Sequence, residues 1–341
     1  MHTNQMLTST RSPTLKKTMA RKLIITGNGL GMALNPEEFS LTTALASVWE
    51  EDHILSGEDK SLIGQCIGHW SSPRGEDELD KLHLSVTSCD LLESIADPEQ
   101  NIHWLSEVGR RFPIATRNYI HKVASYFHNV DESLPDFFID PLVDFIKETK
   151  SHVATLNYDA LLYEKFISNN IFNGYNGILV DGMLDRGFSE SALERRYGND
   201  FGYYMHLHGS PLFYDDDGVT RKLSRYYLNV NQQDFGRHIV LTHVKHKVSV
   251  INGSDLLAAY WRHLSFCLAE SEEIILIGYS GLDTHLNRLV KPYANGKSVK
   301  VVEWSGVDTR EKRERFWRNQ ISSNVFLIHL DSILDFNQWH G

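Results

Sequence analysis

Two histidines two residues apart could carry acid–base chemistry. His206 and His208 close an apolar stretch, residues 203–207, that is typical of a strand, and side chains two apart share one face of a strand. Gly209 and Ser210 then end the strand and open space beside His208, whose imidazole, with an ordinary pKa near ~6.5, could serve as a general base. His206 is enclosed by the strand and is predicted to be a core residue. The pair could also bind a metal, but no convincing third ligand accompanies it, so we expect no metal site.

A second polar pair follows another apolar stretch. Asn157 and Asp159 come directly after residues 153–156 and before a helical pattern at 160–167. The carboxyl ends of parallel strands are where α/β sheets bind ligands, so both side chains are candidates for a binding or catalytic site. Both could instead cap the following helix, and Asp159 could do both.

A glycine-rich turn follows the first strand-like stretch, Lys22–Thr26. Gly27, Asn28 and Gly29 stand where a backbone could approach a pyrophosphate closely. The full dinucleotide fingerprint is not met, because Met32 stands where its last glycine belongs. A tight strand-to-helix turn without a ligand is the alternative interpretation.

A third corner combines glycine with serine. Gly278 and Ser280 nearly form the nucleophile elbow Gly-x-Ser-x-Gly, but Leu282 stands at the position of the second glycine. A serine hydrolase using Asp308 and His329 is therefore a weaker alternative, since the spacing of those two residues carries no specificity. The same corner is equally suited to pass close to a ribose or a phosphate.

The elements that would position these residues form an alternating pattern. Continuous apolar runs of four to six residues suit strands buried on both faces, as in parallel sheets. Besides the first, such runs occupy residues 153–156, 178–180, 239–241, 274–277, 299–302 and 325–328. Helical patterns alternate with several of them, most clearly at 254–270, where Ser254 is the expected N-cap. This alternation predicts an α/β domain with a parallel sheet.

The alternation disappears between about residues 43 and 150, where the apolar spacing is helical and prolines interrupt it. We interpret this segment as a helical insertion after the first βα unit, which covers the ligand crevice or forms an oligomer contact. The apolar positions that carry the helical spacing are Leu79, Leu82, Leu84, Leu91, Leu92 and Ile95.

Composition narrows the class of protein. The chain has 341 residues, 41% hydrophobic and 23% charged, which is typical of a globular protein, and its formal net charge is −10. An acidic chain argues against nucleic-acid binding as the main activity, and no apolar run is long enough to cross a membrane. Three cysteines fit a reducing compartment, so we expect a cytoplasmic protein. Residues 1–21 read as a flexible polar tail, and either Met1 or Met19 could be the natural start.

These motifs, taken in order, resemble the sirtuin superfamily. The set comprises a Gly-x-Gly loop after the first strand, Thr-x-Asn-x-Asp, a Leu-His-Gly-Ser strand end and a Gly-x-Ser corner. The match covers residues 22–42 and roughly 151–305, and it is specific as a set although each piece is weak. The resemblance implies a Rossmann-like, doubly wound fold that binds NAD, formed as a single domain by residues 22–341.

The resemblance also implies roles for individual residues. Asn157 and His208 would be catalytic, with Asn157 orienting water and ribose hydroxyls and His208 acting as the base. The positions implied to contact the dinucleotide are Gly27, Asn28, Gly29, Asp159, Gly278, Ser280, Asp283 and Glu303. Of these, the glycine loop would contact the pyrophosphate, Asp159 the nicotinamide ribose and Glu303 the adenosine ribose.

Departures from the family narrow the expected activity. Protein-deacylating sirtuins carry a four-cysteine zinc module after the catalytic histidine, whereas only Cys267 follows His208 in this chain. The helical insertion and the Asp283-Thr284-His285 continuation look like the bacterial antiphage-defence branch, whose members hydrolyse NAD.

The expected function is therefore that of an NAD⁺ hydrolase, which releases nicotinamide and ADP-ribose during abortive infection. Uncontrolled NAD loss would kill the host, so we expect control by self-assembly or by a separate partner such as a hexameric translocase ATPase. The alternatives are a module that senses NAD or another nucleotide without turning it over and, less favoured, a zinc-free NAD-dependent deacylase.

Overall fold

The apolar runs of the sequence form the strands of one sheet. The computed structural model describes residues 20–97, 99, 102–228, 237–241 and 244–340, so the tail predicted for residues 1–21 falls almost wholly outside the described part. The strands of the sheet are β1 (Lys22–Thr26), β2 (His152–Thr155), β3 (Leu179–Val180), β6 (Gly202–His206), β9 (Glu273–Ile277), β10 (Ser298–Trp304) and β11 (Val325–Leu330). Two short hairpins accompany it, β4 (Met183–Leu184) with β5 (Gly187–Phe188) and β7 (Phe213–Asp216) with β8 (Val219–Lys222).

The order of the strands places a reversal beside β1. Within the described chain the seven strands lie in the order β11-β10-β9-β1-β2-β6-β3, and all neighbours are parallel. The chain first adds strands on the β2 side of β1 and later returns to add β9 on the other side. Open α/β sheets bind ligands at the carboxyl ends of the strands, where such a reversal opens a crevice. The predicted doubly wound parallel sheet is confirmed.

Helices cover both faces of the sheet. Their bounds are α1 (Gly29–Leu34), α2 (Leu41–Trp49), α3 (Gly57–Ile67), α4 (Glu76–Ser94), α5 (Glu107–Asn129), α6 (Asp136–Thr149), α7 (Leu161–Ser168), α8 (Val244–Asn252), α9 (Asp255–Glu270), α10 (Thr284–Ala294) and α11 (Arg310–Gln320). Side chains alternate along β1, so Ile24 packs with α2 to α7, whereas Leu23 and Ile25 pack with α9, α10 and α11. Each face therefore has its own hydrophobic core.

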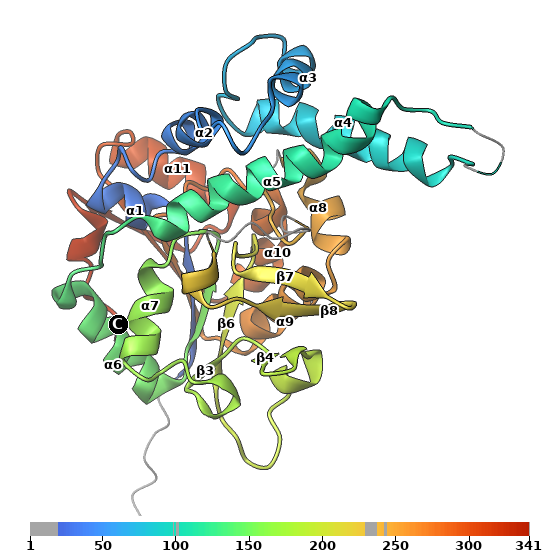
Figure 1. Ribbon diagram of the computed structural model, residues 1–341. Coiled ribbons are helices and arrows are strands. Elements are labelled where there is room, and N and C mark those ends of the chain that lie inside the picture. Colours follow the sequence, from blue (N-terminus) through green and yellow to red (C-terminus); the bar gives the residue numbers. More distant parts are fainter. Residues whose placement is uncertain (1–19, 98, 100–101, 229–236, 242–243, 341) are drawn as a thin grey trace, which may run out of the picture.

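The helical insertion is confirmed, and one of its helices, α5, bonds to loops at the carboxyl edge of the sheet. It contains α2 to α6, and α4 and α5 extend from the body as a hairpin (Figure 1). His121 of α5 donates its Nε2–H to the carbonyl of Pro211 at 2.8 Å, and Nδ1–H of His128 donates to the carbonyl of Tyr158 at 3.0 Å. Burial lowers the pKa of both imidazoles to about 4, so they are neutral at pH 7. These bonds attach α5 to the loops that follow β6 and β2.

Three local predictions can be compared with the structure. The helix predicted at 254–270 is confirmed as α9, and the Ser254 hydroxyl accepts the amide N–H of Leu257 at 3.2 Å, as expected of an N-cap. The strand predicted at 239–241 is wrong. Ile239 forms an isolated antiparallel bridge with Gly209 instead, because this apolar segment is buried against a loop and not against a strand of the sheet.

The third concerns α4, whose apolar spacing predicted a buried helical face. Leu79 and Leu82 are buried, but Leu84, Leu91 and Ile95 are exposed, since the outer half of the hairpin extends beyond the core.

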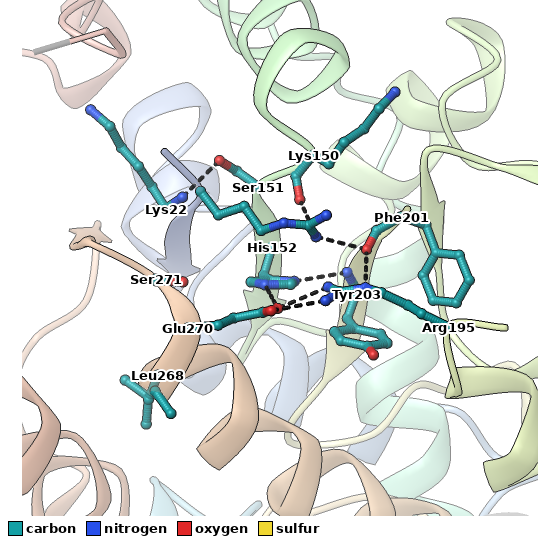
Figure 2. A network of polar contacts seen from close by, with 12 residues as sticks. Lys22, Lys150, Ser151, His152, Arg195, Phe201, Tyr203, Leu268, Glu270 and Ser271 are labelled. Carbon is teal, nitrogen blue, oxygen red and sulfur yellow. Dashed lines mark hydrogen bonds and ion pairs between the residues drawn. The ribbon is translucent and has the colours of Figure 1, made fainter. Parts of the chain in front are cut away.

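The amino edge of the sheet is closed by a charged network (Figure 2). His152 is fully buried, accepts the amide N–H of Tyr203 at 3.1 Å on Nδ1, and has Nε2 2.5 Å from Glu270 Oε1. Arg195 donates to both oxygens of Glu270 at 2.8 Å, and Arg21 donates to the carbonyl of Phe201 at 2.9 Å. These contacts tie β1, β2, β6 and α9 together at the amino edge of the sheet, which lies opposite the carboxyl edge where a ligand is expected.

Candidate functional site

The register of the sheet brings the predicted site residues to one level. Thr155 lies opposite both Thr26 and His206, and Ile277 lies opposite both Thr26 and Val302. Four of the five strands involved therefore end near one row at the carboxyl edge, and β10 continues two residues past it. Each predicted site residue comes a few positions after a strand residue of this row. Segments more than a hundred residues apart in the sequence therefore meet at one edge of the sheet.

The two glycine corners pack directly against each other. The amide of Gly27 donates to the carbonyl of Ile277 at 3.0 Å, and the amide of Gly29 donates to the carbonyl of Gly278 at 2.9 Å. A Cβ on Gly29 would lie 2.5 Å from the Cα of Gly278, which itself has φ of +59°. The contact between the two corners is thus enough to require glycine, even when no ligand is bound. It also occupies two amides that the sequence analysis assigned to a pyrophosphate, while Asn28 donates its side-chain N–H to the carbonyl of Phe39 at 2.9 Å.

We expect Gly29→Ala to lower the free energy of unfolding by roughly 1–3 kcal/mol, because the added methyl overpacks two backbones. Gly57→Ala is the matched control, since a Cβ at that helix position meets nothing within 4 Å. Urea unfolding followed by circular dichroism measures both. Equal stability of the two variants would contradict this account of the glycine corner.

Asn157 and Asp159 present buried acceptor atoms. The Asn157 side chain donates to the carbonyl of Gly27 at 3.1 Å, and Asp159 Oδ1 accepts the amide N–H of Leu161 at 3.1 Å, capping α7. In the described part of the chain, Asn157 Oδ1 and Asp159 Oδ2 are buried and have no hydrogen-bond partner. Buried polar atoms are nearly always paired, so these two oxygens are free to accept hydrogen bonds from a ligand or water.

Burial also perturbs Asp159 itself. It raises the pKa of this carboxyl from 3.8 to about 6, against the opposing hydrogen bonds from Leu161 and the Asn157 side chain. The folded protein therefore holds a proton here that the unfolded chain releases near pH 4. Stability from this group decreases as the pH rises from about 4 to 6, and the loss is complete above that range.

Asp159→Asn removes this cost, so we expect the variant to be more stable than the wild type by about 1–3 kcal/mol at pH 8 and nearly equal to it at pH 4. Denaturation midpoints measured at both pH values test this. A stability difference that does not change with pH would show that the Asp159 carboxyl is not protonated in the folded state.

His208 is buried and paired with an acidic residue. Its Nε2 lies 3.1 Å from Asp283 Oδ2, and Asp283 Oδ1 caps α10 by accepting the amide N–H groups of His285 and Leu286. Burial opposes ionisation of Asp283, but His208, Lys247 and these amides outweigh it and hold the pKa of Asp283 well below its usual range. Burial, together with the charge of Lys247, lowers the pKa of His208 against the effect of Asp283. A neutral imidazole beside an ionised carboxylate results, which is suited to accept a proton.

His206 lies apart from this pair, inside β6. Its ring packs edge-to-face against Tyr204 and Phe213, with centroids 4.9 and 5.3 Å away. Burial places the pKa of His206 well below 6.5. The structure therefore surrounds His206 with core aromatic rings, whereas His208 has an acidic partner.

Glu303 lies within β10 and is already engaged by protein donors. Its carboxylate accepts from Arg313 at 2.7 Å, from Trp317 Nε1 at 2.9 Å and from His329 Nε2 at 3.1 Å. A carboxylate has about four acceptor positions, so little capacity is left for the adenosine ribose that the sequence analysis assigned to it. Arg313 carries no signal in the motifs, because its contact with Glu303 depends on how α11 packs.

The alternative serine nucleophile is not assembled. Ser280 is exposed, and its hydroxyl accepts the amide N–H of Leu282 at 3.4 Å. In the described chain His329 is bonded to Glu303, and Asp308 is paired with Lys312 at 3.1 Å. No triad links the serine to these two residues. The corner holds Ser280 through its carbonyl, which accepts from Arg313 at 3.2 Å.

A cavity of about 560 Å³ lies between α4, α5 and residues 237–241, and none of the predicted site residues lines it. Ile239 and Leu241 line it together with Leu79 of α4 and Ile120 of α5, while the amide of the intervening Val240 donates to the carbonyl of His208 at 2.9 Å. Its volume is within the range of small-molecule sites. A second cavity, of about 480 Å³, lies between the α1–α2 loop and the end of α5.

Two further features bear on possible ligands and location. Among the residues that the structure describes, no three His, Cys, Asp or Glu side chains gather as metal ligands. No helix in the same residues has the length and apolarity needed to cross a bilayer.

No protein-family model matches the chain, and neither does any curated protein.

Proposed function

We propose that this protein is an NAD⁺ hydrolase that cleaves the bond between nicotinamide and ribose. The observation that carries the proposal is a pair of buried, unpartnered acceptors, Asn157 Oδ1 and Asp159 Oδ2, on the loop after β2, next to the β6 end that carries a neutral His208 anchored by Asp283. The site lies at the carboxyl edge, close to the reversal of strand order, as expected for a nucleotide site in an open α/β sheet.

The proposed reaction consumes one water molecule. The bond between ribose C1′ and the nicotinamide nitrogen breaks, its electron pair neutralises the pyridinium, and the water oxygen forms a bond to C1′ of the oxocarbenium-like ribose. His208 takes the proton that the water loses and later returns it to solvent. Asn157 Oδ1 accepts a hydrogen bond from the water or a ribose hydroxyl, and Asp159 holds the polar groups around the ribose in place. The products are nicotinamide, ADP-ribose and one proton.

The burial of the site supports a resting, controlled form of the enzyme. Asn157 and His208 are only 6% and 8% exposed, and α5 is attached to the neighbouring loops. A dinucleotide reaches these atoms only if the covering elements move. On the resemblance described above, we propose control by self-assembly or by a translocase-type ATPase partner, in a cytoplasmic enzyme that depletes NAD⁺ during phage infection.

The experiment is direct. The purified full chain, at a concentration high enough to favour self-assembly, is incubated with NAD⁺, and free nicotinamide and bound nucleotide are measured. Release of nicotinamide without any added peptide supports the hydrolase. Saturable binding of NAD⁺ with no release identifies the sensing module, and release only with an acyl-lysine peptide identifies the deacylase.

A further inference from the structure

We propose that Lys247 and Asp283 form a positioning pair that holds a proton on Nε2 of His208, so that Nδ1 is the atom that accepts the proton. The inference rests on the proposed NAD⁺ hydrolysis and names a positioning residue, Lys247, and a catalytic atom that the motifs do not indicate.

The geometry brings two nitrogen groups, an imidazole and an ammonium, to one carboxylate oxygen of Asp283. Asp283 Oδ2 lies 3.1 Å from Nε2 of His208 and 3.2 Å from Nζ of Lys247, which comes from α8. The other oxygen, Oδ1, is occupied by the first amides of α10. The side chains of Lys247 and Asp283 are only 4% and 5% exposed. A buried ion pair is seldom retained for its stability alone, because desolvation offsets most of its attraction.

The identity of the donors then assigns the proton. An ammonium group is only a donor, and an ionised carboxylate is only an acceptor. Nε2 of His208 must therefore donate its hydrogen to Asp283. A neutral imidazole carries one N–H, so the lone pair lies on Nδ1. The partner of one ring nitrogen thus determines which nitrogen is free to react.

Lys247 also controls the charge that His208 experiences. Asp283 alone would favour the imidazolium, which cannot act as a base, and the neighbouring ammonium of Lys247 counters that effect. Among the residues that the structure describes, Glu76, the first residue of α4, has Oε2 3.7 Å from Nζ of Lys247 and is partly exposed, and His285 interacts electrostatically with both Asp283 and Lys247. Tyr158 and Tyr279 also face Asp283, and burial raises the pKa of both hydroxyls, so both remain uncharged. Replacing Lys247 by a neutral side chain should therefore raise the pKa of His208.

The test uses the full chain labelled with ¹⁵N-histidine, with the His208 signals assigned by comparison with His208→Gln. We expect the nitrogen spectrum of the wild type to show a proton on Nε2 and none on Nδ1. In Lys247→Met, the pKa of His208 should rise by about one unit, and the acid limb of kcat/KM should move up with it. Lys247→Arg keeps the charge and should stay close to the wild type.

Each outcome decides the inference. A proton on Nδ1 in the wild type overturns it without reference to any activity, and so does an unchanged His208 pKa in a folded Lys247→Met. A lower Tm in both lysine variants, with no change in the pKa of His208, shows a merely structural ion pair. If the tautomer and the shift are as expected but no nicotinamide is released, then the hydrolase proposal fails, and the role of Nδ1 as its base fails with it.

Discussion

Asn157→Ala should reduce nicotinamide release by at least about 100-fold while the chain stays folded. The substitution removes the unpartnered Oδ1 that we assign to water or ribose positioning, and losing the orientation of a reactant typically costs that much. It also removes the hydrogen bonds that this side chain donates to the carbonyl of Gly27 and to the Asp159 carboxylate, each of which contributes about 1 kcal/mol to stability. Initial rates of nicotinamide release and urea unfolding, measured on the same preparation, separate the two effects.

Asn169→Ala provides the matched control. The side chain of Asn169 also donates one hydrogen bond to a backbone carbonyl, that of Lys165 at 2.9 Å, but it lies at the end of α7 and outside the carboxyl edge. Both variants should stay folded, with the larger loss of stability in Asn157→Ala because that side chain is buried, and only Asn157→Ala should lose activity. A folded Asn157→Ala protein with full turnover would refute the assignment.

His208→Ala should lower the rate by about 10²–10⁴-fold, the usual contribution of a positioned general base. Nucleotide binding should survive, because the buried acceptors Asn157 Oδ1 and Asp159 Oδ2 lie on another loop and are held without this ring. His206→Ala should instead cost roughly 2–4 kcal/mol of stability, since its ring fills space among the aromatic side chains of Tyr204 and Phe213. NAD⁺ affinity, nicotinamide release and unfolding free energy distinguish the two histidines.

Two results would contradict the assignment of His208 as the base, and each would point to a different error. If folded His206→Ala is inactive and His208→Ala turns over normally, the base has been assigned to the wrong histidine. If neither variant is slower, no imidazole takes part, and catalysis depends on positioning by Asn157 and Asp159 alone.

The sequence predicts the strands and their ends well, because a short apolar run marks each strand and the polar or glycine residues after the run mark its end. The middle of β1, Leu23–Ile25, is continuously apolar and buried, as expected for a strand buried on both faces, and the register then places Asn157 and His208 at one edge. The same signal fails at residues 239–241, which are buried but whose backbone bonds to a loop. Burial is encoded in the residue types, whereas the hydrogen-bond partner is not.

The parts of the site that sequence reasoning missed depend on distant packing. Lys247 is 36 positions from Asp283, and no motif joins them. The sirtuin resemblance implies a ribose contact for Glu303, but Arg313 and Trp317 reach its carboxylate from one face of α11. Contacts between side chains of different helices follow from how those helices are oriented, which the spacing along one chain does not reveal.

The burial of one face of α5 has an energetic consequence for the NAD⁺ hydrolase that we propose. The helix buries the apolar side chains of Phe112, Tyr119, Val123, Ala124 and Phe127. At about 1.5–3 kcal/mol for each of the larger ones, full detachment would cost on the order of 8 kcal/mol. Such a cost leaves fewer than about one molecule in 10⁵ uncovered at any moment, because each 1.4 kcal/mol is a factor of ten. On the proposed function, a cell could therefore keep this protein in standby with negligible background loss of NAD⁺, and the binding energy of the proposed trigger would set the active fraction.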